Sequence, residues 1–278
     1  MKKILILGGT GFVGAHVCEK LVREGWHVTV PTRRRANAQH LQHLPLVTVL
    51  ELDVHDEMVL TRVVAGHDAV VNLVAILHGS QAGFDKVHVA LPQKLARACL
   101  GGGVKQVVHI SALGADAQHF QSAPSMYLRS KGQGEAALMQ AAAGNATSAG
   151  FDLTVLRPSV IFGAADKFLN LFAALQKVFP VMPLAGAQAR FQPVWVEDVA
   201  TAVVKSLETP LGQSPRVLEL VGPDFFTLKD LVQLSAQLSG VRGGRGRPVI
   251  GLPLWAGRLQ ARMMALAPGE PLMSLDNL

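Results

Sequence analysis

The sequence holds little of what marks a secreted, membrane-spanning or disulfide-bonded protein. Its 278 residues include only two cysteines, Cys18 and Cys99. Each falls within a helical pattern, so we expect two small buried side chains and neither a disulfide nor a metal pair. We expect no signal peptide, because the sequence enters an apolar strand at once, and no membrane span, because Lys177 interrupts the nearest candidate, residues 168–187. We therefore expect a soluble, cytoplasmic protein.

Metal and nucleic-acid sites also lack support. All ten histidines lie at or before His119, but they are scattered, and His40 and His43 are not accompanied by an H-E-x-x-H motif or a Cys/His cluster. We expect no metal. The net charge of +6 would suit nucleic acid, yet the basic residues are spread along the chain and aromatic residues make up only 5%. No nucleic-acid partner is expected, because a stacking platform needs aromatic side chains.

Apolar strands alternate with amphipathic helices through the first half of the chain, which predicts repeated βαβ units. The expected strands are residues 2–7, 27–30, 47–50, 69–74, 106–110 and 153–156, and the expected helices between them include 56–64, 84–100 and 125–143. The predicted fold class is α/β, a doubly wound parallel sheet of the Rossmann type.

After residue 160 the alternation weakens, which predicts a smaller C-terminal α/β lobe. Short strands are expected near 190–194 and 217–221, and helices near 199–207 and 228–238. We therefore divide the chain into a dinucleotide-binding domain, residues 1–160, and a smaller substrate or partner lobe, residues 161–278, interleaved with it. Ligands of such sheets bind at the carboxyl ends of the strands.

A glycine-rich loop, GGTGFVG, joins the first strand to the first helix. Gly8 permits the tight turn, Gly11 lets the backbone approach a pyrophosphate, and Gly14 lets the helix pack on the strand. We expect the whole loop, with Thr10, Phe12 and Val13, to hold a dinucleotide. Its spacing differs by one residue from the usual G-x-G-x-x-G fingerprint.

The end of the second strand predicts which coenzyme is bound. The segment HVTVPTRRR has no carboxylate for a ribose diol, and Thr32, Arg33 and Arg34 stand in its place. Arginine pairs with a 2′-phosphate, so NADP(H) is favoured over NAD(H). The alternative is a solvated basic turn.

Two further segments are expected to border the adenosine. Asp53 and Val54 follow the third strand, and Leu73, Val74 and Ala75 follow the fourth. Capping of the next helix is an equally simple explanation for Asp53.

The segment SMYLRSKGQGE predicts a catalytic pair. Tyr127 and Lys131 are four residues apart on a helix and so share a face, where the ammonium should lower the pKa of the phenol toward neutrality. Ser111 ends the preceding strand, where a hydroxyl would hydrogen-bond a substrate oxygen. Tyr127 is the only tyrosine in the chain.

These motifs together resemble those of the extended and atypical short-chain dehydrogenases/reductases, which include the nucleotide-sugar epimerases. Within that group GGTGFVG, NLVAI, YLRSKGQGE and LRPSVIFG most resemble the bacterial homologues of the NADPH-binding accessory subunit of respiratory complex I. The resemblance implies a Rossmann domain with a small C-terminal lobe. It implies that Tyr127 is the acid/base, that Lys131 holds the nicotinamide ribose and that Ser111 orients the substrate oxygen.

The same resemblance places the segment from Arg157 to Gly163, with Pro158 and Val160, beside the nicotinamide. The sequence departs from the family at His88, where many members have asparagine, and at Ser111, which is followed by alanine and leucine where epimerases have a run of Ser or Thr.

Two functions therefore stay open. One is an NADP(H)-dependent oxidoreductase or epimerase that uses Ser111, Tyr127 and Lys131; the other is a non-catalytic module that holds NADPH, as the complex I relatives imply. Apolar residues dominate the second half, which suits an apolar small-molecule substrate, although core helices explain them more simply. Residues 253–268 predict an amphipathic helix with Arg258 and Arg262 on one face, so peripheral association with a membrane or a respiratory complex stays open. The sequence does not determine the oligomeric state.

Overall fold

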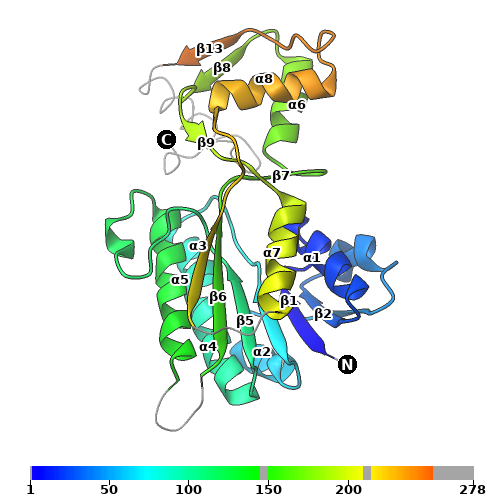
Figure 1. The fold of residues 1–278 in the computed structure, drawn as a ribbon, viewed down its shortest axis with the longest axis vertical. Coiled ribbons are helices and arrows are strands. Elements are labelled where there is room, and N and C mark those ends of the chain that lie inside the picture. The colour runs from blue at the N-terminus through cyan, green and yellow to red at the C-terminus, as the bar shows by residue number, and fades with distance from the viewer. Residues whose placement is uncertain (1, 145–149, 209–213, 253–278) are drawn as a thin grey trace. The chain divides into compact units, whose positions relative to one another are not determined.

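The computed structural model describes residues 2–144, 150–208 and 214–252, and the chain divides into two compact units (Figure 1). Unit 1 comprises residues 1–158 and 196–220, and unit 2 comprises residues 159–195 and 221–278. The chain thus leaves the first unit after its sixth strand, builds part of the second over residues 159–195, and returns to add one more helix and one more strand to the first.

Unit 1 contains a seven-stranded sheet in which every neighbouring pair is parallel, as expected for a Rossmann fold. The strands are β1 (Lys3–Leu7), β2 (His27–Thr32), β3 (Val47–Glu51), β4 (Ala69–Asn72), β5 (Gln106–Ile110), β6 (Asp152–Pro158) and β11 (Arg216–Leu220). Their order is β11-β6-β5-β4-β1-β2-β3. The connections run in opposite directions from β1 and from β4, so the crevice where such folds bind ligands lies between these two strands.

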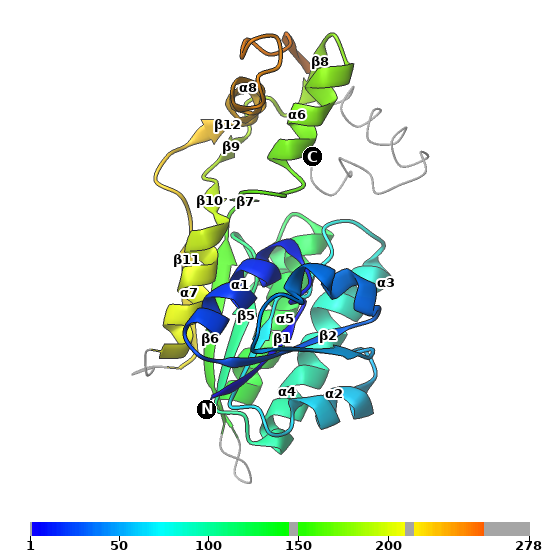
Figure 2. The ribbon, with the colours of Figure 1, turned by 90° about the vertical axis from the view of Figure 1, so that its right-hand side faces the viewer.

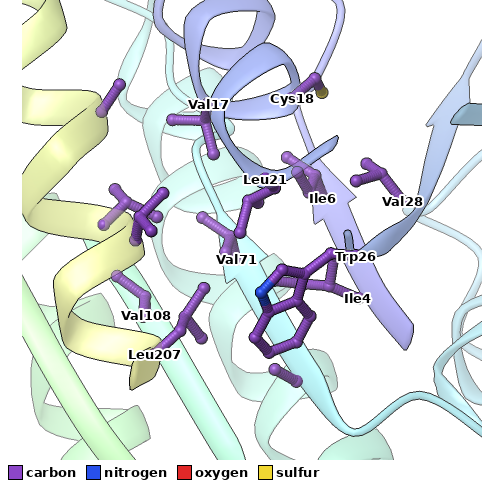
Figure 3. Close-up of a cluster of buried hydrophobic side chains, with 14 of the residues drawn as sticks. Ile4, Ile6, Val17, Cys18, Leu21, Trp26, Val28, Val71, Val108 and Leu207 are labelled. Carbon is purple, nitrogen blue, oxygen red and sulfur yellow. The ribbon is translucent and has the colours of Figure 1, made fainter. Parts of the chain in front are cut away.

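One face of the sheet is covered by α1 (Phe12–Arg23) and α7 (Val196–Glu208), which lie side by side (Figure 1). Val17 and Leu21 of α1 and Leu207 of α7 meet the sheet over Ile4 and other apolar side chains (Figure 3). Each of these side chains is almost fully buried. Burial of one such side chain contributes about 1.5–3 kcal/mol, so this layer supplies much of the stability of the sheet.

The opposite face is covered by α2 (Glu57–Val64), α4 (Leu91–Gly102) and α5 (Met126–Ala142). The sequence predicted a single helix over 84–100, but the structure divides this segment. A short α3 (Gln81–Phe84) runs into a π-helical turn, η2 (Asp85–Ala90), and then into α4. Two 3₁₀ segments complete unit 1, η1 (Arg35–Leu41) after β2 and η3 (Phe120–Ser122) before α5.

Unit 2 is built from short elements. Its strands pair as β7 (Ile161–Phe162) with β10 (Val194–Trp195), β8 (Met182–Ala185) with β13 (Val249–Leu252), and β9 (Arg190–Phe191) with β12 (Phe226–Thr227). Helices α6 (Leu169–Val178) and α8 (Leu228–Ser239) pack together (Figure 2), and a capping box between Thr227 and Asp230 starts α8. The predicted helix over 253–268 lies outside the described residues. Within the described residues no helix is both long and apolar enough to span a bilayer.

Candidate functional site

The glycine loop between β1 and α1 is packed too closely for any larger residue at two positions. Gly8 has φ +83, and a Cβ there would lie 3.1 Å from the backbone carbon of Leu73, at the end of β4. A Cβ on Gly14 would lie 2.3 Å from the carbonyl oxygen of Gly8. The turn therefore sits against the neighbouring strand end and against its own helix. The positive φ of Gly8 and the close packing at Gly14 agree with the roles predicted for these two glycines.

The backbone donors at the amino end of α1 are not committed to a capping side chain. Gly11 is the N-cap and supplies no side-chain hydrogen bond, and the first turn of the helix has no acidic residue. Thr10, Phe12 and Val13 are half-buried around this turn. Helix N-terminal N–H groups and the helix dipole favour an anion, so the loop fits a dinucleotide pyrophosphate.

The end of β2 presents two guanidinium groups. Arg33 and Arg34 are exposed, and neither guanidinium donates a hydrogen bond or forms an ion pair within the described residues. Thr32 Oγ1 donates to the carbonyl oxygen of Arg34 at 3.1 Å, which closes the turn. The carboxylate in register with Thr32 is that of Glu51 on β3, and it accepts the backbone N–H of Arg35 at 3.0 Å. The Glu51 carboxylate is therefore already engaged.

The segments expected to border the adenosine follow β3 and β4. Asp53 is exposed and accepts the N–H of His55 at 3.0 Å, whereas Asp56 caps α2. The capping explanation for Asp53 is thus wrong. Val54 packs on the core beneath α2 and α4.

The three residues after β4 start beside the glycine turn. Leu73 and Val74 are half-buried and Ala75 is exposed. The side chain of Asn72 fixes this segment, because its Oδ1 accepts the N–H of Val74 at 3.2 Å and its Nδ2 lies 3.2 Å from His109 Nδ1. Leu73 and Val74 thus lie next to Gly8, at the crevice between β1 and β4.

Two of the predicted catalytic residues, Ser111 and Lys131, lie together at the end of β5, and the third is on α5. Ser111 is 4% exposed, its N–H donates to Leu156 at 2.7 Å, and its Oγ is buried without a hydrogen-bond partner in the described part of the chain. Lys131 is 2% exposed, and its Nζ donates to the carbonyl oxygen of Ile110, next to Ser111, at 2.7 Å. Tyr127 lies one helical turn before Lys131 and is half-buried.

The prediction that Lys131 lowers the pKa of Tyr127 is wrong. Burial raises the pKa of Tyr127 to about 12, so the phenol stays protonated at neutral pH. Burial also lowers the pKa of Lys131 to about 8, against an opposing effect of the Glu135 carboxylate. The ammonium that was expected to favour a phenolate is itself desolvated and is bonded to a backbone carbonyl.

The resemblance placed the segment from Arg157 to Gly163 beside the nicotinamide. In the structure Pro158 belongs to unit 1 and Val160 to unit 2. The carbonyl oxygen of Pro158 accepts the N–H of Leu113, two residues after Ser111, at 2.9 Å, so Pro158 belongs with the site. Val160 lies in unit 2, where it accepts the N–H of Val194.

Sequence reasoning missed a buried ion pair behind Lys131. Glu135 is fully buried and receives two hydrogen bonds from Arg157, at 3.0 Å from Nε and 2.6 Å from Nη2. The carboxylate hydrogen bond raises the pKa of Arg157, so the pair stays charged. The i, i+4 spacing indicated only that Glu135 shares a helix face with Lys131, and no local pattern indicated its pairing with Arg157 on β6.

A cluster of side chains around Tyr127 was also missed. Phe84, His88 and Ser130 are buried beside it, and two glycines of α5 permit the close packing of this region. A Cβ on Gly132 would lie 2.4 Å from the carbonyl oxygen of Asp116, and one on Gly134 would lie 2.0 Å from that of His88. The G-Q-G spacing after Lys131, unusual within a helix, was the available signal.

Comparisons with known proteins agree with the fold. A family model described as the NAD dependent epimerase/dehydratase family matches residues 4–220. The mitochondrial NADH dehydrogenase (ubiquinone) 1 alpha subcomplex subunit 9 of Arabidopsis thaliana is 30% identical over 236 residues, which are 82% of this chain and 56% of that subunit. The chain thus spans little more than half the length of that relative.

Two other matches are an enzyme and a solved structure. The ceramide reductase of Caulobacter vibrioides is 28% identical over 244 residues, which are 86% of this chain and 71% of that protein. The structure of a dTDP-glucose 4,6-dehydratase from Streptomyces venezuelae, with NAD bound, superposes with a TM-score of 0.77 at 21% identity, and covers 90% of this chain and 85% of that one. At this identity the structural match shows the fold alone.

Proposed function

The chain belongs to the NAD dependent epimerase/dehydratase family, and on that premise we propose that it is an NADP(H)-dependent oxidoreductase acting on an apolar, lipid-like carbonyl or carbinol compound. Its character as a dinucleotide-binding relative of the short-chain dehydrogenases follows from the family itself. One observation carries the catalytic part of the proposal. Ser111 Oγ is buried without a partner in the described residues, at the strand end that Lys131 reaches and before the helix that carries Tyr127.

Residues of unit 1 suit each part of the coenzyme. Gly8, Gly11, Gly14 and the amino end of α1 would hold the pyrophosphate. The segments after β3 and β4 would border the adenosine. The free guanidinium groups of Arg33 and Arg34 support a preference for NADP(H), because charge-assisted hydrogen bonds to a phosphate are stronger than neutral ones. When bound, the coenzyme supplies or accepts a hydride.

The side chains at the end of β5 suit proton transfer to a carbonyl oxygen. A phenol with a pKa of about 12 is protonated at neutral pH, so Tyr127 is suited to donate a proton to the substrate oxygen in the reductive direction. Ser111 Oγ would donate a hydrogen bond to the same oxygen. With a pKa of about 8, Lys131 lies close enough to neutrality to return a proton to Tyr127.

The substrate class rests on two observations. The ceramide reductase and a sterol-4-alpha-carboxylate 3-dehydrogenase of Dictyostelium discoideum are among the similar proteins, and both are named for apolar substrates. The second half of the chain is rich in apolar residues. We keep the cytoplasm as the proposed location, since both cysteines are free and buried.

A second candidate is a coenzyme-holding component associated with a respiratory complex. The relatives from Arabidopsis thaliana and Mus musculus, each 30% identical, are named as subunits of NADH dehydrogenase (ubiquinone). A Rossmann fold does not by itself establish catalysis. A coenzyme-holding component would bind NADPH without oxidising it.

A substrate screen separates the two candidates. Purified protein with NADPH would be offered long-chain keto-amides, sterol ketones, quinones, small aldehydes and sugar nucleotides, and NADPH oxidation would be followed by absorbance. Turnover that favours the long-chain or sterol ketones supports the oxidoreductase. If no class is reduced while NADPH still raises the thermal midpoint, the coenzyme-holding candidate becomes the better account.

A further inference from the structure

His88 stands at the centre of a hydrogen-bond chain that joins the segment after β4 to α5. The backbone N–H of Ile76 donates to His88 Nε2 at 3.1 Å. His88 Nδ1 lies 2.9 Å from Ser130 Oγ, and Ser130 Oγ donates to the carbonyl oxygen of Tyr127 at 2.8 Å. His88 is 2% exposed and Ser130 is 1% exposed, so water does not compete for these bonds.

The partners determine where the protons of this chain lie. Because Nε2 accepts a backbone N–H, it carries no proton, and the proton of the neutral ring is on Nδ1. Nδ1 therefore donates to Ser130 Oγ, whose own proton goes to the carbonyl oxygen of Tyr127. Burial and the nearby Lys131 lower the pKa of His88 to about 3, so the ring keeps this neutral form at physiological pH. Each donor in this series of hydrogen bonds therefore has one acceptor.

The same histidine also holds the ring of Tyr127. The two rings are perpendicular with centroids 5.4 Å apart, and Phe84 packs against both, at 5.5 Å from His88 and 6.2 Å from Tyr127. The π-helical turn η2 places His88 there, and π-turns within helices are frequent at functional sites. Gly134 lets α5 approach the carbonyl oxygen of His88 so closely that no side chain would fit.

We propose that His88 is a positioning residue. It fixes the position of Tyr127, the proposed acid/base, relative to the backbone segment after β4 that is expected to border the coenzyme. One arm, Ile76 to His88, orders the segment after β4. The other arm, His88 through Ser130, orders the first turn of α5 and with it the phenol. This rests on the proposed function for its catalytic meaning, but the positioning itself is a property of unit 1.

The test compares three variants. His88→Phe keeps an aromatic ring of similar size and removes both arms, His88→Gln supplies one acceptor and one donor again, and Ser130→Ala removes only the arm to α5. His67→Phe is the matched control, because His67 is half-buried in the same unit and bonds Thr29 Oγ1 at 2.8 Å, away from these groups. Three quantities are measured: the Kd for NADPH, the hydrogen exchange of the Ile76 amide, and the phenolate absorbance during an alkaline titration.

The chain has one tyrosine, so the phenolate absorbance reports Tyr127 alone. In His88→Phe we expect exchange of the Ile76 amide to accelerate, NADPH affinity to fall by about tenfold, and the midpoint of the tyrosine titration to move down from about 12 toward 10. Ser130→Ala should move the titration while leaving Ile76 exchange near that of wild type. His88→Gln should restore most of each quantity.

The outcomes separate this inference from the proposed function. If His88→Phe behaves as wild type in all three measurements, His88 only fills space and the inference is overturned. Equal effects of His67→Phe would overturn it as well. If the expected changes appear although wild type oxidises NADPH with no substrate class, the positioning role stands and the oxidoreductase proposal fails.

Discussion

Replacing Lys131 with methionine should make the stability of the protein depend less on pH. The pKa of this lysine is lowered from 10.5 to about 8 because its ammonium group is buried. At about 1.4 kcal/mol for each pH unit, the charged form costs the folded state about 3 kcal/mol. Methionine has nearly the same length and carries no charge, so the variant avoids this cost.

The direction of this pH dependence follows from whether the folded or the unfolded state binds the proton of Lys131. Below pH 8 the lysine is charged in both states, and the cost is present in full. Between pH 8 and 10.5 the unfolded chain keeps the proton that the folded protein has lost, so the free energy of unfolding of wild type rises with pH. Above 10.5 the cost is gone. Relative to that of the variant, the free energy of unfolding of wild type should therefore rise by about 3 kcal/mol between neutral and strongly alkaline pH.

A second effect of the substitution does not obscure the first. The variant leaves the carbonyl oxygen of Ile110 without the donor that Lys131 provides at 2.7 Å, a loss of about 1–3 kcal/mol. This loss is nearly the same at every pH, because a neutral amine also donates. The effect of Tyr127 on alkaline stability is shared by both proteins. The pH dependence of the difference thus reports the buried charge alone.

The assay is urea unfolding at several pH values. Trp26 is buried in unit 1, so Trp195 and Trp255 are replaced by phenylalanine in all the proteins and fluorescence then follows unit 1. Lys86→Met, at an exposed lysine on η2, controls for the loss of one lysine. A difference between wild type and Lys131→Met that is constant across the range would refute the reasoning, since it would mean that the ammonium is not desolvated.

Two further predictions concern the coenzyme. Alanine at both Arg33 and Arg34 should weaken NADPH binding by about 1–3 kcal/mol and leave NADH binding nearly unchanged, because only the 2′-phosphate loses its partners; an unchanged ratio of the two affinities in a fluorescence titration would exclude this role. Gly14→Ala should abolish coenzyme binding and destabilise unit 1 by about 1–3 kcal/mol, since its Cβ would lie 2.3 Å from a backbone oxygen. Gly101→Ala, in a helix with open space around it, is the control, and equal behaviour of the two alanine variants in coenzyme binding and thermal unfolding would contradict the close-packing argument.

Six strands of the parallel sheet were predictable from the sequence because each is largely an apolar run between turn residues, whereas the strand near 217–221 was expected in the C-terminal lobe and instead joins the sheet as β11. Strand β5, over 106–110, was predicted with its observed bounds. The glycine turn was also predictable, since Gly8 and Gly14 are required by backbone contacts within a short segment. Local patterns of this kind carry their own physical cause.

The electrostatics around Tyr127 were not predictable in the same way. The spacing of Tyr127 and Lys131 shows that they share a helix face, but it does not show that Lys131 donates to Ile110 on a strand 21 residues earlier. The hydrogen bonds of His88 join three separate segments, and the π-turn that places it has no marked sequence pattern. Desolvation depends on how those segments pack, and so the pKa of Tyr127 rises where the local pattern predicted a fall.

The central claim, that this chain turns over the coenzyme held by its glycine loop, is tested most directly by comparing wild type with Tyr127→Phe. Both proteins would be mixed with NADPH and with the carbonyl compound that reacts fastest in the screen, and the first turnover would be followed by NADPH absorbance. We expect equal NADPH affinity and a rate lower by about 10²- to 10⁴-fold in the variant, because only the proton donor is lost. Equal rates in the two proteins, or no oxidation by wild type with any compound, would contradict the claim.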